Sequence, residues 1–168
     1  MEKQRLEQLV AHGEELIYEG DLFIFGDLFL KDSTLIVEGN IFVKGFTTLQ
    51  GSDLKCKKLS CSQIDATDSE IYVDYLCALN IYSDGDIFVV NDAIAGKVNA
   101  MNYYVGRDNY SNEITTIQDI NILGNNSSRT IKARDVYVEG ICQMHYFGIC
   151  AHSFRSGYIY DCTSINIK

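Results

Sequence analysis

Proline and tryptophan are absent from this chain of 168 residues, histidine occurs only three times, and long apolar runs are missing. Without a run of 18 or more apolar residues, a transmembrane helix is excluded. The N-terminal stretch also lacks the apolar core of a signal peptide, reading MEKQRLEQLVAHGEELIYEG. We therefore expect a cytoplasmic protein.

Positive charge is also scarce, because 14 Lys and Arg residues are outnumbered by 23 Asp and Glu residues. The resulting net charge of -9 would repel a phosphate backbone or an anionic membrane. Nucleic acid and membrane are therefore not expected as partners, whereas a basic protein would be attracted. Many soluble proteins are this acidic simply to remain soluble, and that explanation stays open.

The residues that are present indicate strands joined by tight polar corners. The chain is 46% hydrophobic and 22% charged, as is common for globular proteins, and it has 11 tyrosines with many Ile, Val and Asn residues. Cysteine in a cytosolic chain stays reduced and behaves as a small hydrophobe. We therefore expect a role in core packing for the six cysteines, which are Cys56, Cys61, Cys77, Cys142, Cys150 and Cys162.

From residue 20 onward, apolar residues recur in pairs two positions apart, as one side of a short strand requires. Gly-Asp, Gly-Asn and Asp-Gly corners separate many of these pairs, and glycine and asparagine tolerate positive φ there. The pairs are Leu22/Ile24, Leu28/Leu30, Leu35/Val37, Ile41/Val43, Ile71/Val73, Leu79/Ile81, Ile87/Val89, Val136/Val138 and Ile165/Ile167.

A longer period emerges when an aliphatic residue followed two positions later by a small residue is used as a marker. The markers begin at Leu54, Leu76, Val98 and Ile131, so the first two steps are equal and the third is half as long again. Very polar runs flank residues 106–129, so we interpret the long step as an insertion there. The shorter step predicts a parallel β-helix, or β-solenoid, with roughly 20 to 22 residues per coil. An antiparallel meander of hairpins is the alternative fold.

Residues 1–19 have the pattern of an amphipathic helix, with Leu6, Leu9, Val10, Leu16 and Ile17 able to share one side. Because a solenoid leaves unpaired strand edges at its ends, we expect this helix to cap the first coil. The predicted organisation is a capping helix over residues 1–19 and a single mainly β domain, the solenoid, over residues 20–168, with the polar insertion around residues 106–129.

Several patterns contain residue types that can carry chemistry, but none of them predicts a catalytic or cofactor site. Cys142, His145, Cys150 and His152 offer zinc-ligand types, but their spacing is not that of an established zinc motif. The many aspartates lie mostly at glycine-containing corners, as turn chemistry requires, so neither calcium binding nor polysaccharide cleavage is favoured. We expect no cofactor, no metal and no catalytic residues.

Tyrosines and acidic residues in the second half of the chain are the candidates for binding a protein. A tyrosine ring supplies contact area and its hydroxyl supplies a hydrogen bond, although buried tyrosines would be equally ordinary. The candidate binding residues are Tyr103, Tyr104, Asp108, Tyr110, Glu113, Tyr158 and Tyr160.

Residues 20–45, GDLFIFGDLFLKDSTLIVEGNIFVKG, resemble the solenoid core of bactofilins, which are bacterial cytoskeletal proteins. The resemblance rests on a Gly-polar-aliphatic unit, seen at Gly20-Asp21-Leu22, Gly26-Asp27-Leu28, Gly39-Asn40-Ile41 and Gly85-Asp86-Ile87. It implies a β-helix that polymerises end to end without nucleotide and without catalytic residues. The expected N-terminal helix and the irregular residues 106–129 depart from that pattern. Hexapeptide acyltransferases are a second solenoid family, but no histidine lies in the regular stretch to act as a base.

These observations favour a non-catalytic solenoid that binds a basic protein through an acidic, tyrosine-bearing surface. One version is an immunity-type inhibitor of a basic toxin domain. A structural alternative is a bactofilin-like scaffold that self-associates through its coil ends. An acyltransferase or a polysaccharide-acting enzyme is a further alternative.

Overall fold

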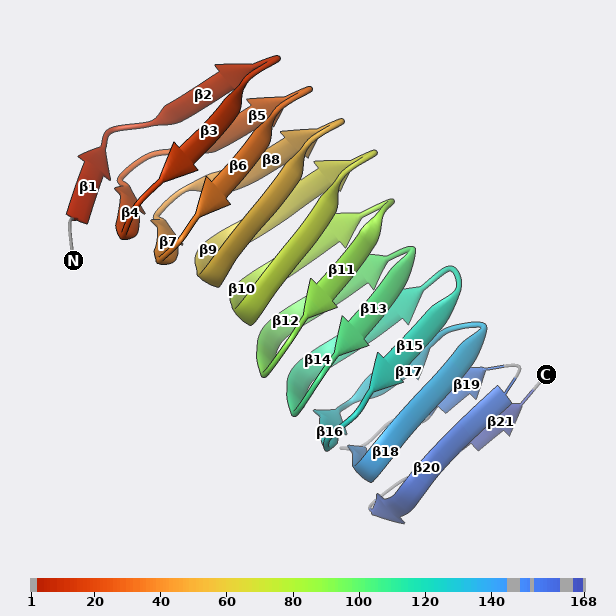
Figure 1. Cartoon of the computed structure of the whole chain (residues 1–168). Helices are drawn as coiled ribbons and strands as arrows, with labels where there is room; N and C mark the ends of the chain where they lie inside the picture. Colours follow the sequence, from red (N-terminus) through yellow and green to blue (C-terminus); the bar gives the residue numbers. More distant parts are fainter. Residues whose placement is uncertain (1–2, 145–148, 152, 161–164, 168) are drawn as a thin grey trace.

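The structure, a computed structural model, describes residues 3–144, 149–151, 153–160 and 165–167, with the backbone alone for Cys150, Tyr158, Tyr160 and residues 165–167. The described chain consists of strands without a helix and winds into a parallel β-solenoid of about nine turns (Figure 1). All strand pairings are parallel, so the antiparallel meander is excluded. The predicted mainly β solenoid is confirmed.

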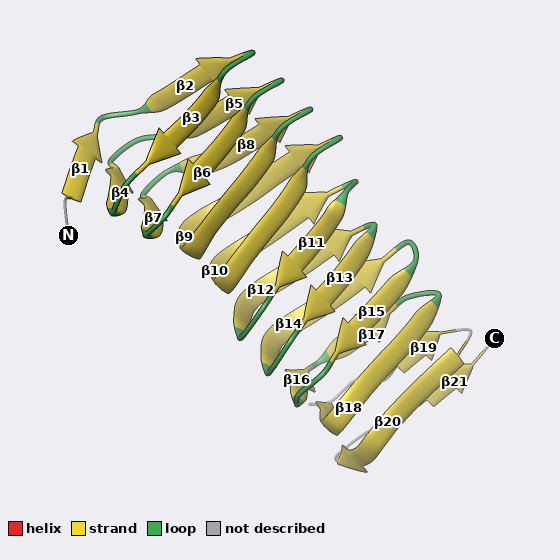
Figure 2. Ribbon diagram, in the orientation of Figure 1, coloured by secondary structure: helices red, strands yellow, loops and turns green. Residues whose placement is uncertain are grey.

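Each turn has three faces, here named A, B and C in chain order, and short corners join them (Figure 2). In the first turns each face has its own strand. Face A contains β1 (Lys3–Leu6), β4 (Asp21–Ile24) and β7 (Asn40–Val43); face B contains β2 (Leu9–His12), β5 (Leu28–Lys31) and β8 (Phe46–Gln50); face C contains β3 (Glu15–Tyr18) and β6 (Thr34–Val37).

Further along the chain, some strands bend around corners and serve two or three faces. Strands β9 (Asp53–Thr67) and β10 (Glu70–Ser83) cross faces C, A and B. Face C continues with β11 (Asp86–Val89), β13 (Asn102–Val105) and β15 (Asp119–Ile122), and faces A and B continue with β12 (Ala93–Ala100), β14 (Asn109–Thr116), β16 (Asn126–Ser128) and β17 (Thr130–Lys132). The last strands are β18 (Asp135–Met144) and β20 (Ser153–Tyr160) on faces C and A, and β19 (Ile149–Ala151) and β21 (Ile165–Ile167) on face B.

The core is a stack of inward side chains that alternate with outward ones along every strand. In β6 and β7, for example, Leu35, Val37, Ile41 and Val43 are all buried, as their two-residue spacing predicts. Parallel pairing places each inward residue on the equivalent residue of the next turn, so aliphatic side chains form continuous columns. The expected core role is confirmed for Cys56 and Cys142, which are buried, while Cys61 packs at the margin of the core and Cys77 is half-buried. Cys162 and the side chain of Cys150 lie outside the described residues.

The corner between faces B and C is formed by a repeated small motif. Ser33, Ser52 and Ser69 are buried, and each donates its hydroxyl proton to the carbonyl two residues earlier. Each hydroxyl also accepts a hydrogen bond from the backbone of the preceding turn, such as Ser33 N to Ser52 Oγ at 3.1 Å. The residue before each serine has positive φ, as at Gly51 with 55°. This serine ladder satisfies backbone groups that the corner removes from the strand ladder.

The coils are shorter than predicted, with 19 residues in the first turns and 16 or 17 in the middle. The pattern used for the prediction, an aliphatic residue followed two positions later by a small residue, occurs on all three faces. Each face of a turn buries two residues that are two positions apart, so any face can show this pattern. Leu54 lies on face C and Leu76 on face A, so the step between them is a full turn with one additional side. Val98 and Ile131 both lie on face B, two turns apart, and the longer step between them therefore needs no insertion.

In place of the expected insertion, residues 106–129 contain β14, β15 and β16 in register with the turns on either side. The polar residues of this segment either point outward or, like Asn109 and Asn126, hydrogen bond to one another inside the solenoid. The polar composition of residues 106–129 therefore does not indicate a loop.

The predicted N-terminal capping helix is wrong, because residues 3–18 form β1, β2 and β3 of the first turn. Parallel pairing with β4, β5 and β6 selects extended backbone over the helix that the local pattern also permits. Leu9 points inward, whereas Val10 and Ile17 are 50% and 62% exposed, so the five apolar residues do not share a side. Gly13 forms the corner with φ of 67°.

Thr47 is a polar residue in one of the buried columns of inward side chains, so it tests whether these columns favour apolar groups. It lies between Leu28 and Ile64 on face B, is fully buried, and its hydroxyl has no hydrogen-bond partner in the described chain other than the weakly polar Cys61 thiol. We expect Thr47→Val to raise the free energy of unfolding by about 1 kcal/mol, because a methyl group replaces a poorly satisfied buried hydroxyl. Urea denaturation measures this. The control is Thr48→Val on the outer side of the same strand; equal gains at both positions would contradict the account.

Candidate functional site

The candidate site is the outer surface of face C, which lies along the front of the solenoid in Figure 1. Because the strands of this face pair in register, the central outward residue of each turn lies next to its equivalents, about 4.8 Å away. The resulting row is Ile17, Ile36, Lys55, Tyr72, Phe88, Tyr104, Asn121, Tyr137 and Arg155.

The middle of this row is an aromatic ladder. The rings of Phe88 and Tyr104 stack with centroids 4.8 Å apart and an interplanar angle of 3°. Tyr72 is tilted against Phe88, with centroids 6.5 Å apart, and the Lys55 ammonium lies over its ring at 5.5 Å from the centroid. The rings of the ladder thus contact one another along the face, and Tyr72 already has a cation of the same chain over its ring.

A groove of about 490 Å³ lies beside the ladder. The groove is hollow because Gly106 has no side chain and the side chain of Asn121 is short. Their neighbours on adjacent turns are larger: Val90 and Leu123 beside Gly106, and Tyr104 and Tyr137 beside Asn121. Val90 and Leu123 form the far wall and are 41% and 54% exposed. The groove thus combines an aromatic floor with an exposed aliphatic wall.

Two further hollows extend the groove in both directions along the solenoid axis. One shares Tyr72 with it, has a volume of about 450 Å³ and is lined also by Lys55, Lys57 and Asp74. The other shares Asn121 and Tyr137, has a volume of about 380 Å³ and includes Phe154 and Arg155 among its lining residues. Face C therefore offers an elongated site rather than a closed cavity for a small ligand.

The edge of face C that follows the serine corner is acidic. The first residue of each strand contributes to this edge, which contains Asp53, Glu70, Asp86, Asn102, Asp119 and Asp135 on successive turns. Asn102 donates to Asp86 at 2.8 Å. Arg134 binds Asp119 through Nη2 at 2.8 Å and Asp135 through Nε at 3.0 Å. Burial, and then the negative charges of Asp86 and Asp119, raise the pKa of the Tyr104 hydroxyl, so this tyrosine stays protonated beside the acidic edge.

The candidate residues from the sequence are scattered over the solenoid. Only Tyr104 belongs to the aromatic ladder. Asp108 lies at the corner between faces C and A, where it accepts a hydrogen bond from Asn125 N at 2.7 Å. Glu113 lies at the corner between faces A and B, with Lys97 at 3.8 Å. Tyr110 is on face A and 50% exposed.

Tyr103 must be removed from the candidate surface, because its side chain is fully buried. It is an inward residue of β13, and its hydroxyl donates to Asn109 Oδ1 at 2.9 Å. In an alternating strand, adjacent tyrosines necessarily point to opposite sides, so Tyr103 and Tyr104 cannot both be exposed. The side chains of Tyr158 and Tyr160 lie outside the described residues.

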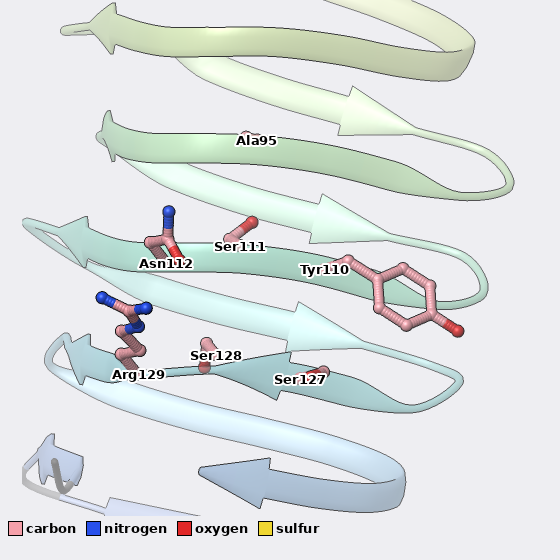
Figure 3. A pocket seen from close by; sticks show the side chains of 7 residues that line it. All are labelled: Ala95, Tyr110, Ser111, Asn112, Ser127, Ser128 and Arg129. Atoms are coloured by element: carbon pink, nitrogen blue, oxygen red, sulfur yellow. The ribbon is translucent and has the colours of Figure 1, made fainter. Parts of the chain in front are cut away.

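A smaller polar hollow of about 420 Å³ lies on face A around Tyr110. Figure 3 shows Asn112 and Arg129 projecting at its corner end, while Tyr110 points away from them. Its floor consists of the small side chains of Ala95, Ser111 and Ser128, and the serines are buried. Ser128 already accepts a hydrogen bond from Asn126, and among the described residues this hollow has no aromatic ladder or aliphatic wall like those of the groove on face C.

The cysteine and histidine positions show no metal centre in the part of the chain that is described. Cys142 is buried and its sulfur accepts a hydrogen bond from Asn126 Nδ2 at 3.6 Å. His145, His152 and the side chain of Cys150 lie outside the described residues.

The Cys56 thiol in the core and the Cys61 thiol at its margin are expected to make the stability of the solenoid sensitive to alkaline pH. Burial raises the pKa of Cys56 from 9.0 to about 12 and that of Cys61 from 9.0 to about 11. Between these values an unfolded chain has lost protons that the folded chain retains, so the free energy of unfolding falls as pH rises above about 9. We expect constant melting temperatures from pH 7 to 8.5 and a decline above that. Cys56→Val should flatten the decline, and an unchanged slope in this variant would refute the explanation.

Sequence reasoning missed most of the groove residues, although a signal for the ladder exists. Tyr72, Phe88 and Tyr104 each lie between two inward residues, in Ile-Tyr-Val, Ile-Phe-Val and Tyr-Tyr-Val, and they recur at equal intervals. That interval can be recognised as one turn of the solenoid only when the register of the strands is known. Val90 and Leu123 had no comparable signal, because each follows a strand end.

Comparison with protein-family models, with curated proteins and with solved structures gives no match to this chain. Within the described ranges, no helix is long and apolar enough to cross a membrane.

Proposed function

We propose that this chain is a non-catalytic, protein-binding β-solenoid that uses face C to bind a basic protein. The observation that carries the proposal is the groove beside the aromatic ladder, with Val90 and Leu123 exposed along its wall. An exposed apolar patch with a polar rim is typical of interaction sites, and rigid aromatic rings are frequent anchors of protein interfaces.

The charge of the molecule supports a basic partner. The net charge is -9, and carboxylates lie along the edge of face C where its strands begin, across the aromatic ladder from the aliphatic wall of the groove. Such a surface attracts a positively charged protein over several ångströms and speeds its association. An immunity-type inhibitor that blocks a basic toxin domain is one concrete form of this function, in which affinity comes from the aromatic groove and orientation from the acidic edge.

The test is capture of the partner from the native host by the tagged chain, with and without the product of the neighbouring gene. The wild type is compared with Phe88→Ser/Tyr104→Ser, and with Tyr110→Ser as a matched control on face A. We expect stoichiometric recovery with the wild type and the control, and at least about tenfold less with the double variant. Equal recovery with all three proteins, or no stoichiometric partner, would overturn the proposal.

One observation favours self-association as a second candidate function. The first turn consists of strands instead of a capping helix, so β1, β2 and β3 pair on one side only within the described chain. Open strand edges favour stacking with another chain. Light scattering with electron microscopy tests this candidate, since concentration-dependent filaments would support it and a discrete monomer or dimer would eliminate it.

A further inference from the structure

Face C already shows how a guanidinium group binds to its acidic edge. Asp119 and Asp135 begin adjacent turns of the face, and Arg134 contacts both of them, through Nη2 at 2.8 Å and Nε at 3.0 Å. The planar guanidinium has several N–H donors in a fixed arrangement, so one group can bind two carboxylates a single turn apart. The spacing of the solenoid, about 4.8 Å, thus suits arginine.

The same arrangement of carboxylates recurs beside the aromatic ladder. Glu70 and Asp86 precede Ile71 and Ile87, which pair directly, so the two carboxylates also begin adjacent turns. Asp53 pairs with Glu70 on the other side. The ion pairs found within the described ranges involve none of these three acidic residues, and Asp86 accepts a hydrogen bond from the neutral Asn102 amide through Oδ1 at 2.8 Å. Like charges on neighbouring strands repel each other, so a cation would be stabilising here.

The surroundings add contacts for the rest of a bound segment. Tyr72 and Phe88 lie on the same two turns as Glu70 and Asp86, and the position of Lys55 over the Tyr72 ring shows that the ladder accepts a cation. The aliphatic wall at Val90 lies four residues along the strand from Asp86, about 13 Å away. An arginine on one side of the face and an aliphatic side chain on the other would therefore both be bound.

We infer that face C recognises an arginine of a protein partner, bound across Glu70 and Asp86 against the aromatic ladder, next to an aliphatic residue in the hollow above Gly106. This inference rests on the proposed function of face C as a binding surface. Arginine is preferred to lysine, because only a guanidinium can span both carboxylates as Arg134 spans Asp119 and Asp135.

The probes are three synthetic peptides that alternate leucine with arginine, lysine or glutamate, titrated into the whole protein and followed by NMR. We expect the arginine peptide to shift resonances of residues 70–73 and 86–90, the lysine peptide to bind several-fold more weakly, and the glutamate peptide not to bind. Glu70→Gln/Asp86→Asn should weaken arginine binding at least about tenfold. The control, Asp65→Asn/Glu113→Gln, removes equal charge away from face C and should change binding little.

Equal binding of the arginine and lysine peptides, or equal loss in both double variants, would overturn the inference. Its failure is distinguishable from failure of the proposed function. If a native partner requires Phe88 and Tyr104 but is insensitive to Glu70→Gln/Asp86→Asn, face C binds a protein without this arginine contact. If the arginine peptide binds as expected and the host yields no partner, the arginine site on face C stands, but the proposed function fails and the assignment of this site to a protein partner fails with it.

Discussion

Gly39→Ala is expected to lower the free energy of unfolding by about 3 kcal/mol or more. A Cβ atom at this position would clash with the carbonyl oxygen and the carbonyl carbon of Gly20 in the preceding turn. Both atoms are backbone, so relief of the contact would require the two turns to separate and would weaken their hydrogen bonds. Equilibrium urea denaturation, followed by circular dichroism, measures the loss.

Gly13→Ala is the matched control, because a Cβ atom there has no heavy atom within 4 Å but the residue has φ of 67°. Its cost is limited to left-handed backbone strain, about 1 kcal/mol. If the two variants lose equal stability, close stacking of the turns is not what requires glycine at position 39.

Asn109→Leu is expected to cost about 3 kcal/mol, because it breaks a buried polar network at its centre. Asn109 accepts hydrogen bonds from Tyr103 Oη at 2.9 Å and Ser111 Oγ at 3.0 Å, and it donates to Asn126 Oδ1 at 2.8 Å. Leucine has a similar volume but would remove the partner that Asn109 gives to the Tyr103 hydroxyl, the Ser111 hydroxyl and Asn126 Oδ1 in the core. Urea denaturation again provides the measurement.

Two further variants show whether the network causes the loss. Asn99→Leu lies on the outer side of face B and should change stability by no more than about 0.5 kcal/mol. Asn109→Leu combined with Asn126→Leu should cost less than the sum of the single variants, because each substitution removes a partner of the other. Strict additivity would argue against a coupled asparagine pair.

The inward residues of the solenoid were readable from the sequence because strand alternation is a local property. Leu22, Ile24, Leu35 and Val37 are buried as predicted. The pair Leu79/Ile81 shows the limit of this reasoning, since Ile81 is buried and Leu79 is 66% exposed at a corner that interrupts the alternation. Corners become visible only when the turns are aligned.

The turn length and the first coil were not readable, because both depend on pairing between distant residues. The apolar residues from Leu6 to Ile17 fit a helix locally, and only their register with β4, β5 and β6 selects strands. The spacing of Ser33, Ser52 and Ser69 at 19 and 17 residues gives the true turn length. Three serines in a chain of this length are too few to be distinguished from chance without the structure.

The binding residues predicted from the sequence lie on different faces of the solenoid, and only one of those with described side chains lies on the outer surface of the face that we propose as the binding surface. Exposed tyrosine beside acidic residues describes Tyr104 and its edge, whereas Tyr103 is buried and Tyr110 lies on another face. The difference arises because a solenoid distributes neighbouring residues over different faces, while it gathers residues that are 16 to 19 positions apart.

The central claim, that face C is the binding surface, is tested most directly by photo-cross-linking in the native host. A benzoylphenylalanine is placed at the outward position of each face within one turn, at Phe88 on face C, Ile94 on face A or Asn99 on face B. We expect a covalent adduct with one partner protein from position 88 and none from positions 94 and 99. An adduct from position 94 or 99 and none from position 88 would show that the partner binds another face.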